Sequence, residues 1–281
     1  MNIIYRLAVD IGGTFTDAVL VSGSGDVLAA TKTLTTHDDP SHGAIAGSRD
    51  VVRRAGVTLG DVSGFIHGTT LATNALIERR GARVASVTTS GFRDILEIAY
   101  ERRYSQYDID LDKPDLIVPR ARCFTVPGRI SASGQIIEPF DARAVEDLVI
   151  ALDNCGAEAI AICLLHSYAN AEHEQRLGDA LSALRPELSI SLSSDVSPEA
   201  REFDRLCTTI ANAYVQPLMS SYLADFAERF SEEGLKCPIL MMTSGGGMTT
   251  LETAAQFPIR LVESGPAGGR SLRHELPNNA D

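Results

Sequence analysis

Short apolar runs separated by glycine-rich or polar turns dominate the first part of the chain. Three of these runs, at residues 7–11, 18–21 and 27–34, are rich in branched side chains and too short to be helices. We expect them to form three consecutive antiparallel strands. Pro40 then opens a predicted helix that runs to Ala55 and stops at Gly56.

The pattern next alternates between strands and helices. A strand at residues 65–67 leads into a predicted helix at residues 71–80, closed by Gly81, and another strand follows at residues 83–88. This succession predicts one sheet whose strands are joined by a crossover helix.

The second half of the chain continues in the same way, which indicates an α/β fold. Residues 93–115 are densely charged without a clear period, so they are either a functional lid or a solvated surface loop. Beyond them we expect a hairpin around residues 131–134, helices at 141–154 and 171–184, strands at 157–165, 188–192 and 239–243, and two separate helices begun by Pro198 and Pro217.

The turn between the first two strands carries the clearest candidate chemistry. Gly12 and Gly13 can adopt positive φ and lack side chains, so their N–H groups can approach a phosphate closely. Thr14 and Thr16 add hydroxyl groups. The alternative is an ordinary glycine hairpin turn in which Asp and Thr serve as turn residues.

Two acids flank this turn, and they bear on which ion the site needs. Asp10 and Asp17 would repel a bare phosphate, so a phosphate site here requires a divalent cation between the charges. Mg²⁺ held by a carboxylate, waters and phosphate oxygens is the expected arrangement, with Asp10 as its protein ligand.

A second polar group lies where residues 65–67 meet the following helix. His67, Thr69, Thr70 and Asn74 form a candidate cup for a substrate. A helix cap with His67 packed beneath it explains the same residues equally well. Two glycine-rich turns, at residues 244–247 and 264–269, are either ligand-wrapping loops or plain connections.

Composition narrows the class of protein. The chain has 281 residues and a net charge of −12, which argues against non-specific nucleic-acid binding and against anionic membranes. No apolar run approaches the roughly 20 residues of a membrane helix, and we read no signal peptide. Five dispersed cysteines without a Cys-x-x-Cys pair argue against zinc or disulfides and favour the cytoplasm.

The order Asp-x-Gly-Gly-Thr-x-Thr-Asp resembles the first phosphate motif of the actin, sugar-kinase and Hsp70 superfamily of ATPases. With its other motifs, the chain resembles the hydantoinase and 5-oxoprolinase family, whose relatives include N-methylhydantoinase A subunits and the acetone carboxylase β subunit. The stretches that carry this resemblance are residues 9–21, 67–75, 88–94, 161–168, 193–198, 212–215 and 264–268.

This resemblance implies an actin-like fold and an ATP-dependent opening of a small cyclic amide such as a hydantoin or 5-oxoproline. It implies phosphate contacts from Gly12, Gly13, Thr14 and Thr16, with catalytic roles for Asp10 and Asp17. It also implies a hydantoinase B-type partner subunit, and a homo-oligomer is possible.

The chain departs from the family at two places. The family's Ser-Asn-Gly-Gly turn stands here as Ser-Gly-Gly-Gly at residues 244–247, and the 281 residues contain one Asp-x-Gly-Gly-Thr element where relatives have two. We therefore expect an N-terminal domain at residues 1–198, an incomplete second domain at 199–281, and a fragment, truncated product or split subunit. A ketone carboxylase subunit and a non-catalytic assembly module remain as alternatives.

Overall fold

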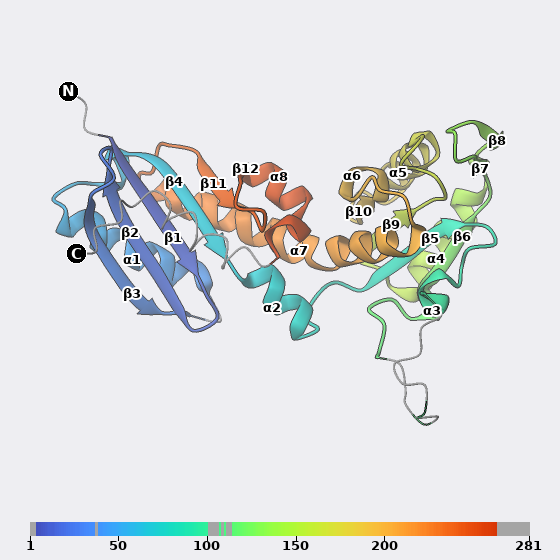
Figure 1. The fold of residues 1–281 in the computed structure, drawn as a ribbon, viewed down its shortest axis with the longest axis horizontal. Coiled ribbons are helices and arrows are strands. Elements are labelled where there is room, and N and C mark those ends of the chain that lie inside the picture. The colour runs from blue at the N-terminus through green and yellow to red at the C-terminus, as the bar shows by residue number, and fades with distance from the viewer. Residues whose placement is uncertain (1–3, 37–38, 101–106, 108–109, 111–113, 263–281) are drawn as a thin grey trace. The chain divides into compact units, whose positions relative to one another are not determined.

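The computed structural model describes residues 4–36, 39–100, 107, 110 and 114–262. The chain forms two compact units (Figure 1). Unit 1 combines Met1–Arg80 with Leu218–Asp281, and unit 2 consists of Gly81–Pro217. Unit 2 is therefore inserted into the sequence of unit 1. The sequence predicts a boundary at residue 198 between two family domains. That boundary differs from the division into compact units and stays a prediction.

Unit 1 is built on a six-stranded sheet with the order β12-β11-β4-β1-β2-β3. Its strands are β1 (Tyr5–Ile11), β2 (Phe15–Ser22), β3 (Val27–Leu34), β4 (Val62–Thr69), β11 (Ile239–Met242) and β12 (Met248–Thr250). The first three strands are antiparallel neighbours, as predicted, whereas β4 runs parallel to both β1 and β11.

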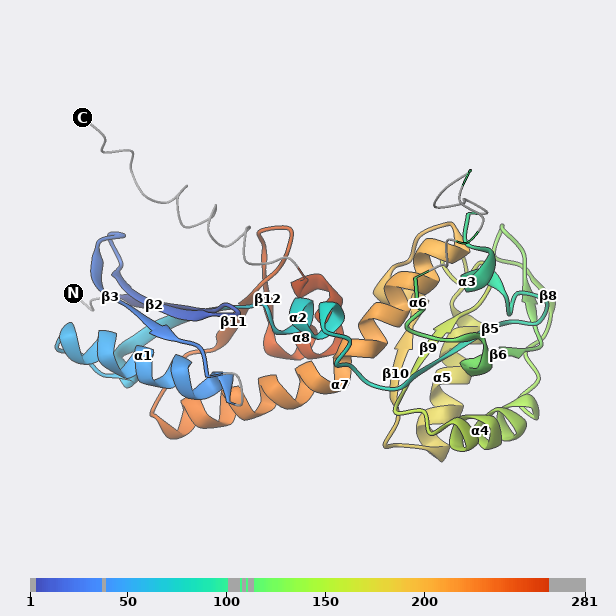
Figure 2. The same ribbon diagram turned by 90° about the horizontal axis from the view of Figure 1, so that it is seen from below.

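Helices pack on one face of this sheet. Unit 1 contains α1 (Pro40–Arg54), α2 (Leu71–Ile77), α8 (Leu251–Gln256), two 3₁₀ turns (Leu59–Asp61 and Pro258–Leu261) and the second half of α7 (Glu202–Glu232). Figure 2 shows α1 and that half of α7 on the same side of the sheet. Helix α1 packs closely on the sheet because Gly47 has no side chain. A Cβ atom at this position would lie only 3.3 Å from the Cβ atom of Ala18.

The core of unit 1 follows from the alternation of side chains along its strands. Leu7, Val9 and Ile11 of β1 are buried on the helix-covered face. From α7, Phe226 and Phe230 pack edge-on against Phe65, with ring centroids 6.1 and 4.8 Å from its own. These aromatic contacts hold the C-terminal half of α7 to a sheet begun at the N-terminus.

Unit 2 is built on a four-stranded parallel sheet with the order β10-β9-β5-β6. Both central strands are buried along their whole length, as expected for a parallel sheet with two covered faces. The strands are β5 (Val84–Thr89), β6 (Cys123–Val126), β9 (Ala159–Cys163) and β10 (Ser189–Leu192), and the hairpin is β7 (Arg129–Ile130) and β8 (Ile136–Glu138). The remaining elements are α3 (Ile95–Ile98), α4 (Ala144–Cys155), α5 (Glu172–Leu184), α6 (Ser193–Val196), the first half of α7 and a 3₁₀ turn (Arg120–Arg122).

A buried polar network fastens the ends of β9 and β10. The carboxylate of Glu174 accepts hydrogen bonds from Leu164 N, Ser193 Oγ and Ser194 N at 2.7, 2.7 and 2.8 Å. Arg205 is equally buried and donates to Ser193 Oγ and to the carbonyl of Leu164. Because each buried charge has several partners, the network holds the turns after both strands in place.

The predicted crossover helix between residues 65–67 and 83–88 is wrong. The first strand became β4 of unit 1 and the second became β5 of unit 2, so they lie in different sheets. Helix α2 also ends earlier than expected, at Ile77. Gly81 does not cap it, and instead lies against Tyr214, where a Cβ atom would come within 2.3 Å of the ring.

The two helices predicted around Pro217 are one helix, α7, which contains this proline. Proline removes one backbone donor but need not end a helix when tertiary contacts hold both sides. Here Val215 and Met219 are fully buried on either side of Pro217.

Other predictions met mixed outcomes. The hairpin around residues 131–134 is confirmed, whereas α4 begins at Ala144, after a turn in which Asp141 Oδ1 accepts from Arg143 N. The turn at residues 244–247 connects β11 to β12, with Thr243 N donating to Gly247 O at 2.9 Å. The turn at 264–269 and residues 101–106, 108–109 and 111–113 of the predicted lid or surface loop lie outside the described residues. Among the helices described, none is long and apolar enough to cross a membrane.

Candidate functional site

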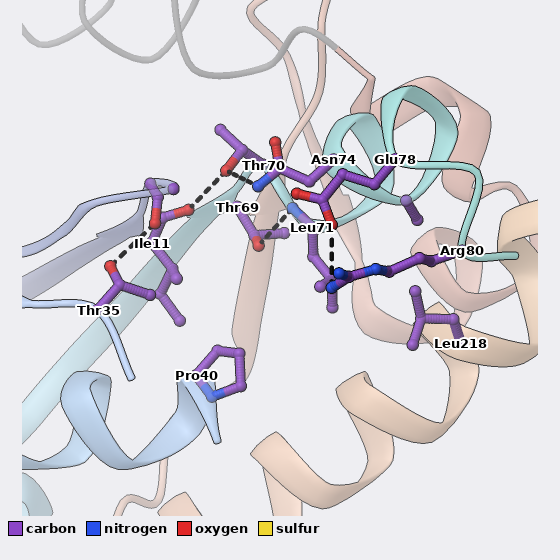
Figure 3. Close-up of a pocket in the computed structure, with 13 residues that line it drawn as sticks. Ile11, Thr35, Pro40, Thr69, Thr70, Leu71, Asn74, Glu78, Arg80 and Leu218 are labelled. Atoms are coloured by element: carbon purple, nitrogen blue, oxygen red, sulfur yellow. Dashed lines mark hydrogen bonds and ion pairs between the residues drawn. The ribbon is translucent and has the colours of Figure 1, made fainter. Parts of the chain in front are cut away.

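A pocket of about 410 Å³ opens in unit 1 at the carboxyl ends of β1 and β4 (Figure 3). Parallel pairing sets Ile11 opposite Thr69, so the turns that follow both strands meet at one edge of the sheet. The pocket is lined by Ile11, Gly12, Gly13, Thr35, Pro40, Thr69, Thr70, Leu71, Asn74, Ala75, Glu78, Arg80 and Leu218. Five candidates from two separate sequence motifs therefore share one site.

The glycine turn approaches the second motif directly. Gly12 N donates to Phe15 O at 2.9 Å, which closes the turn between β1 and β2. A Cβ atom at Gly13 would lie 3.7 Å from Asn74 Nδ2. Neither glycine has a positive φ, so that part of the prediction is wrong. The approach of a phosphate to N–H groups that no side chain covers stays a prediction. Glycine matters at residue 13 because a larger side chain would fill the space in front of Asn74.

The two threonines of the turn take different places. Thr14 is exposed and does not line the pocket, and Thr16 is buried on the core face of β2. Thr16 Oγ1 lies 3.1 Å from Thr35 Oγ1, which donates to Gly12 O at 2.9 Å. Thr16 thus braces the turn through Thr35, a pocket residue that the motif did not reveal.

Asp10 and Asp17 face each other across β1 and β2, one pair before the turn. Both oxygens of Asp17 accept from Lys32 Nζ, at 2.8 and 2.7 Å, so its charge is compensated. Within the part of the chain that the structure describes, the Asp10 carboxylate has no hydrogen bond or ion pair. The side chain is still partly open to solvent. Partial dehydration, and secondly the charge of Asp17, raise its pKa, although Lys32 lowers it.

This environment fits a divalent cation. An unpartnered carboxylate beside a second acid gains stability when a cation binds. No group of three His, Cys, Asp or Glu side chains in the described chain could hold a metal alone. Mg²⁺ at this place would therefore be bound by Asp10, water molecules and the oxygens of a bound phosphate.

Gly68 supports Asp10, although only its neighbours were predicted as site residues. It pairs with Asp10 across β4 and β1, and a Cβ atom at this position would lie 2.6 Å from Asp10 Oδ1. The carboxylate occupies the space that a side chain would fill. The signal for this role is the strand register, which the sequence alone does not show.

His67 lies outside the pocket, in the core of unit 1. It is fully buried and stacks on Phe226, with ring centroids 4.2 Å apart. Nδ1 lies 3.1 Å from Val9 O and Nε2 lies 2.7 Å from Tyr222 Oη. Since only a donor can face a carbonyl oxygen, Nδ1 carries the proton and Nε2 accepts from the tyrosine. Burial lowers the pKa of His67 to about 4, so the packed alternative describes this residue.

Helix α2 forms one wall of the pocket. Thr69 is buried, and its Oγ1 accepts from Leu71 N at 3.2 Å at the start of the helix. Thr70 donates to Ile11 O, and Asn74 Nδ2 donates to Thr70 Oγ1, each at 3.4 Å. These long contacts leave the hydroxyl and the carboxamide able to turn toward a ligand.

Comparison with known proteins places these features in a family. Residues 6–184 match the family model described as hydantoinase/oxoprolinase N-terminal region, and residues 205–279 match the one described as hydantoinase/oxoprolinase. Caprolactamase subunit alpha of Pseudomonas jessenii is 32% identical over 94% of this chain and 38% of its own length. For 5-oxoprolinase 1 of Arabidopsis thaliana the identity is 30%, over 94% of this chain and 23% of that protein.

Solved structures agree with this result. The crystal structure of the ATP-dependent caprolactamase from Pseudomonas jessenii superimposes with a TM-score of 0.82 at 31% identity, over 93% of this chain and 39% of that one. The nucleotide-free structure of acetone carboxylase gives a TM-score of 0.83 at 26% identity, over 96% and 40%. The predicted actin-like α/β fold is thereby confirmed. The chain spans about two fifths or less of each of these relatives.

Proposed function

The chain belongs to the hydantoinase/oxoprolinase family, and from that premise we propose that it forms the phosphate-binding part of an ATP-dependent subunit that opens a small cyclic amide. The observation that carries this proposal is the shared pocket, where the Gly12–Gly13 turn meets Thr70 and Asn74. Asp10 is not among the residues that line this pocket, but it lies on β1, two residues before Gly12. Caprolactamase, one of the similar structures, is described as ATP-dependent.

The proposed chemistry explains why a phosphate site and an amide site should adjoin. An amide carbon is a poor electrophile, and its oxygen is a poor leaving group. Bound ATP would supply a phosphoryl group to the amide oxygen with release of ADP, and water would then add to the activated carbon. The ring C–N bond would break as the nitrogen takes up a proton, and hydrolysis of the acyl phosphate left behind would give the carboxylate and inorganic phosphate. The protein contributes mainly position and charge compensation to such a transfer.

Each residue has a role in this proposal. The Gly12–Gly13 turn lets phosphate oxygens approach the backbone, and Asp10 holds Mg²⁺ against them. The charge of Asp17, offset only in part by Lys32, raises the pKa of Asp10 and so favours a cation beside that carboxylate. Thr70 and Asn74 supply a hydroxyl and a carboxamide that match the donor and acceptor of an amide.

Gly13→Val tests the site. A valine here fills the space before Asn74, so we expect Mg·ATP affinity to fall at least tenfold in calorimetry while the far-UV spectrum is unchanged. Gly245→Val is the matched control, because this turn glycine has no atom within 4 Å of its Cβ position and no positive φ. Undiminished Mg·ATP binding by a folded Gly13→Val chain would falsify the placement.

Two other functions are compatible with the fold. The similarity to acetone carboxylase supports an ATP-dependent ketone carboxylase subunit, and a non-catalytic assembly module is the third reading. Phosphate release, measured in the presence of the partner subunit, separates the three functions. Release stimulated by hydantoin or 5-oxoproline supports amide opening, release stimulated by acetone plus bicarbonate supports ketone carboxylation, and no release supports the assembly module.

A hydantoinase B-type partner is proposed because relatives are named as subunits. The five free cysteines support a reducing compartment such as the cytoplasm.

A further inference from the structure

The charged end of the pocket has no role in the function proposed above. Among the thirteen described residues that line the pocket, Arg80 is the one cation and Glu78 the one anion. Glu78 Oε2 lies 3.1 Å from Arg80 Nη1. The other lining residues are apolar, glycine, threonine or asparagine. The two charges therefore distinguish one end of the pocket from the other.

Helix α2 orders the pocket along its length. Leu71, Asn74, Ala75 and Glu78 follow the spacing i, i+3, i+4, i+7 and lie on one helical face. At about 1.5 Å of rise per residue, Glu78 lies roughly 6 Å beyond Asn74 along the axis. A ligand that contacts Asn74 can therefore reach the charged end across the length of one small ring.

The guanidinium of Arg80 pairs with Glu78 and has further N–H donors for a second acceptor. In Figure 3 the Arg80 side chain extends along α2 and brings its guanidinium toward Glu78 and Leu71. Glu78 approaches Nη1, whereas a guanidinium has five N–H donors in a planar fork. A second carboxylate can be bound in the same plane while Glu78 keeps its contact.

We propose that Arg80 is a specificity residue that selects a cyclic amide carrying a carboxylate on its ring. This inference rests on the proposed function, since it assigns the amide to Thr70 and Asn74. Leu71, Ala75 and Leu218 contact the ring, and Arg80 binds the carboxylate. Glu78 compensates part of the charge of Arg80, which favours a singly charged carboxylate over a phosphate with two or more charges.

The test compares two rings that differ in one group. Calorimetry measures the affinity of the 281-residue chain for 5-oxoproline and for 2-pyrrolidinone, the same ring without the carboxylate, in the absence of nucleotide. Because the Arg80 side chain is 79% exposed, water competes for it, and we expect a preference of about fivefold for 5-oxoproline. Arg80→Gln should reduce this preference to about one without weakening 2-pyrrolidinone binding.

Arg53→Gln is the matched control. Arg53 is also 79% exposed and pairs with an acid of its own helix, Asp50, at 2.6 Å, but it lies outside the pocket. This variant should keep the wild-type preference. Mg·ATP titration of the same three proteins should give equal affinities.

The outcomes separate this inference from the proposed function. Equal binding of both rings by the wild type overturns the role of Arg80 and leaves the amide site intact. Weakened Mg·ATP binding by Arg80→Gln with an unchanged ring preference assigns Arg80 to phosphate and also overturns it. If neither ring binds at millimolar concentration, both the ring site and this inference fail, while the Gly13→Val experiment still decides the phosphate site.

Discussion

Gly68 and Asp10 show how an absent side chain determines where a charged one lies. The Asp10 carboxylate lies where a side chain at residue 68 would be, and partial dehydration together with the charge of Asp17 raises the pKa of Asp10. A cation-binding carboxylate needs a defined position. The glycine is therefore part of the proposed Mg²⁺ site although it has no group that could bind the ion.

We expect Gly68→Ala to lower Mg·ATP affinity about tenfold, because its Cβ atom would lie 2.6 Å from Asp10 Oδ1 and displace the carboxylate. Gly64→Ala is the control. Gly64 lies on the same strand and face, but a Cβ atom there meets its nearest neighbour at 3.8 Å. Equal calorimetric affinities of the two variants would show that the position of Asp10 does not matter.

His67 predicts a pH dependence of stability. Its pKa falls from 6.5 to about 4 on folding because burial disfavours the charged ring. The unfolded chain therefore takes up a proton that the folded chain excludes, and stability is lost as the pH falls from about 6.5 to 4. One proton corresponds to about 1.4 kcal/mol per pH unit, or about 3 kcal/mol over this interval.

Urea denaturation between pH 7 and pH 4.5 measures this effect. We expect His67→Gln, which cannot titrate, to have a shallower decline of unfolding free energy toward acid than the wild type. The exposed His42 provides the comparison, and His42→Gln should keep the wild-type slope. Parallel curves for His67→Gln and the wild type would contradict the assignment.

Individual site residues were predictable to the extent that neighbours in sequence are neighbours in space. The motifs identified Gly12, Gly13, Thr70 and Asn74, which all line the pocket. Thr16 could have been excluded, since alternation along β2 places it on the same buried face as Ala18 and Leu20. The roles of Thr35, Gly68 and Arg80 depend on register and tertiary packing, which no local pattern contains.

At the scale of elements, periodicity predicted most strands but not their neighbours. Residues 27–34 were expected as a strand and form β3 with the same bounds. The order of the strands across the sheet cannot be predicted from periodicity, because β11 pairs with β4 from more than 170 residues away. Such non-local pairing leaves no trace in a short window, so the assignment of β4 and β5 to one sheet was wrong.

The segment that follows α2 and enters unit 2 packs closely against Tyr214 at Gly81. Any side chain there would meet both the ring and the carbonyl oxygen of Tyr214, at 2.3 and 2.5 Å. We expect Gly81→Ala to lower the unfolding free energy by about 1–3 kcal/mol, the usual cost of overpacking. Urea denaturation provides the measurement. Gly245→Ala, in open space, should cost less than about 0.5 kcal/mol.

At the scale of the whole molecule, the family resemblance was the strongest prediction, and it is confirmed by two family models that match residues 6–184 and 205–279. Two domains were expected, but the insertion of one compact unit into the sequence of the other was not foreseen. Unit 1 is discontinuous in sequence, whereas unit 2 is one continuous segment. A pattern read along the chain treats residues 71–88 as one structural succession, although the chain leaves one unit there and enters another.

This discontinuity implies an order of events while the chain is being made. A ribosome releases β1 to β4 first, but the sheet of unit 1 needs β11 at Ile239–Met242 and Phe226 and Phe230 of α7 to complete its core. Unit 2 has all its strands by Leu192, so it should acquire its native structure while the earlier strands still wait for partners. Pulse proteolysis of stalled nascent chains should show protection of residues 81–217 before residues 5–34, and simultaneous protection would contradict it. The N-terminal strands, bearing the phosphate turn, would thus be the first made and among the last to fold.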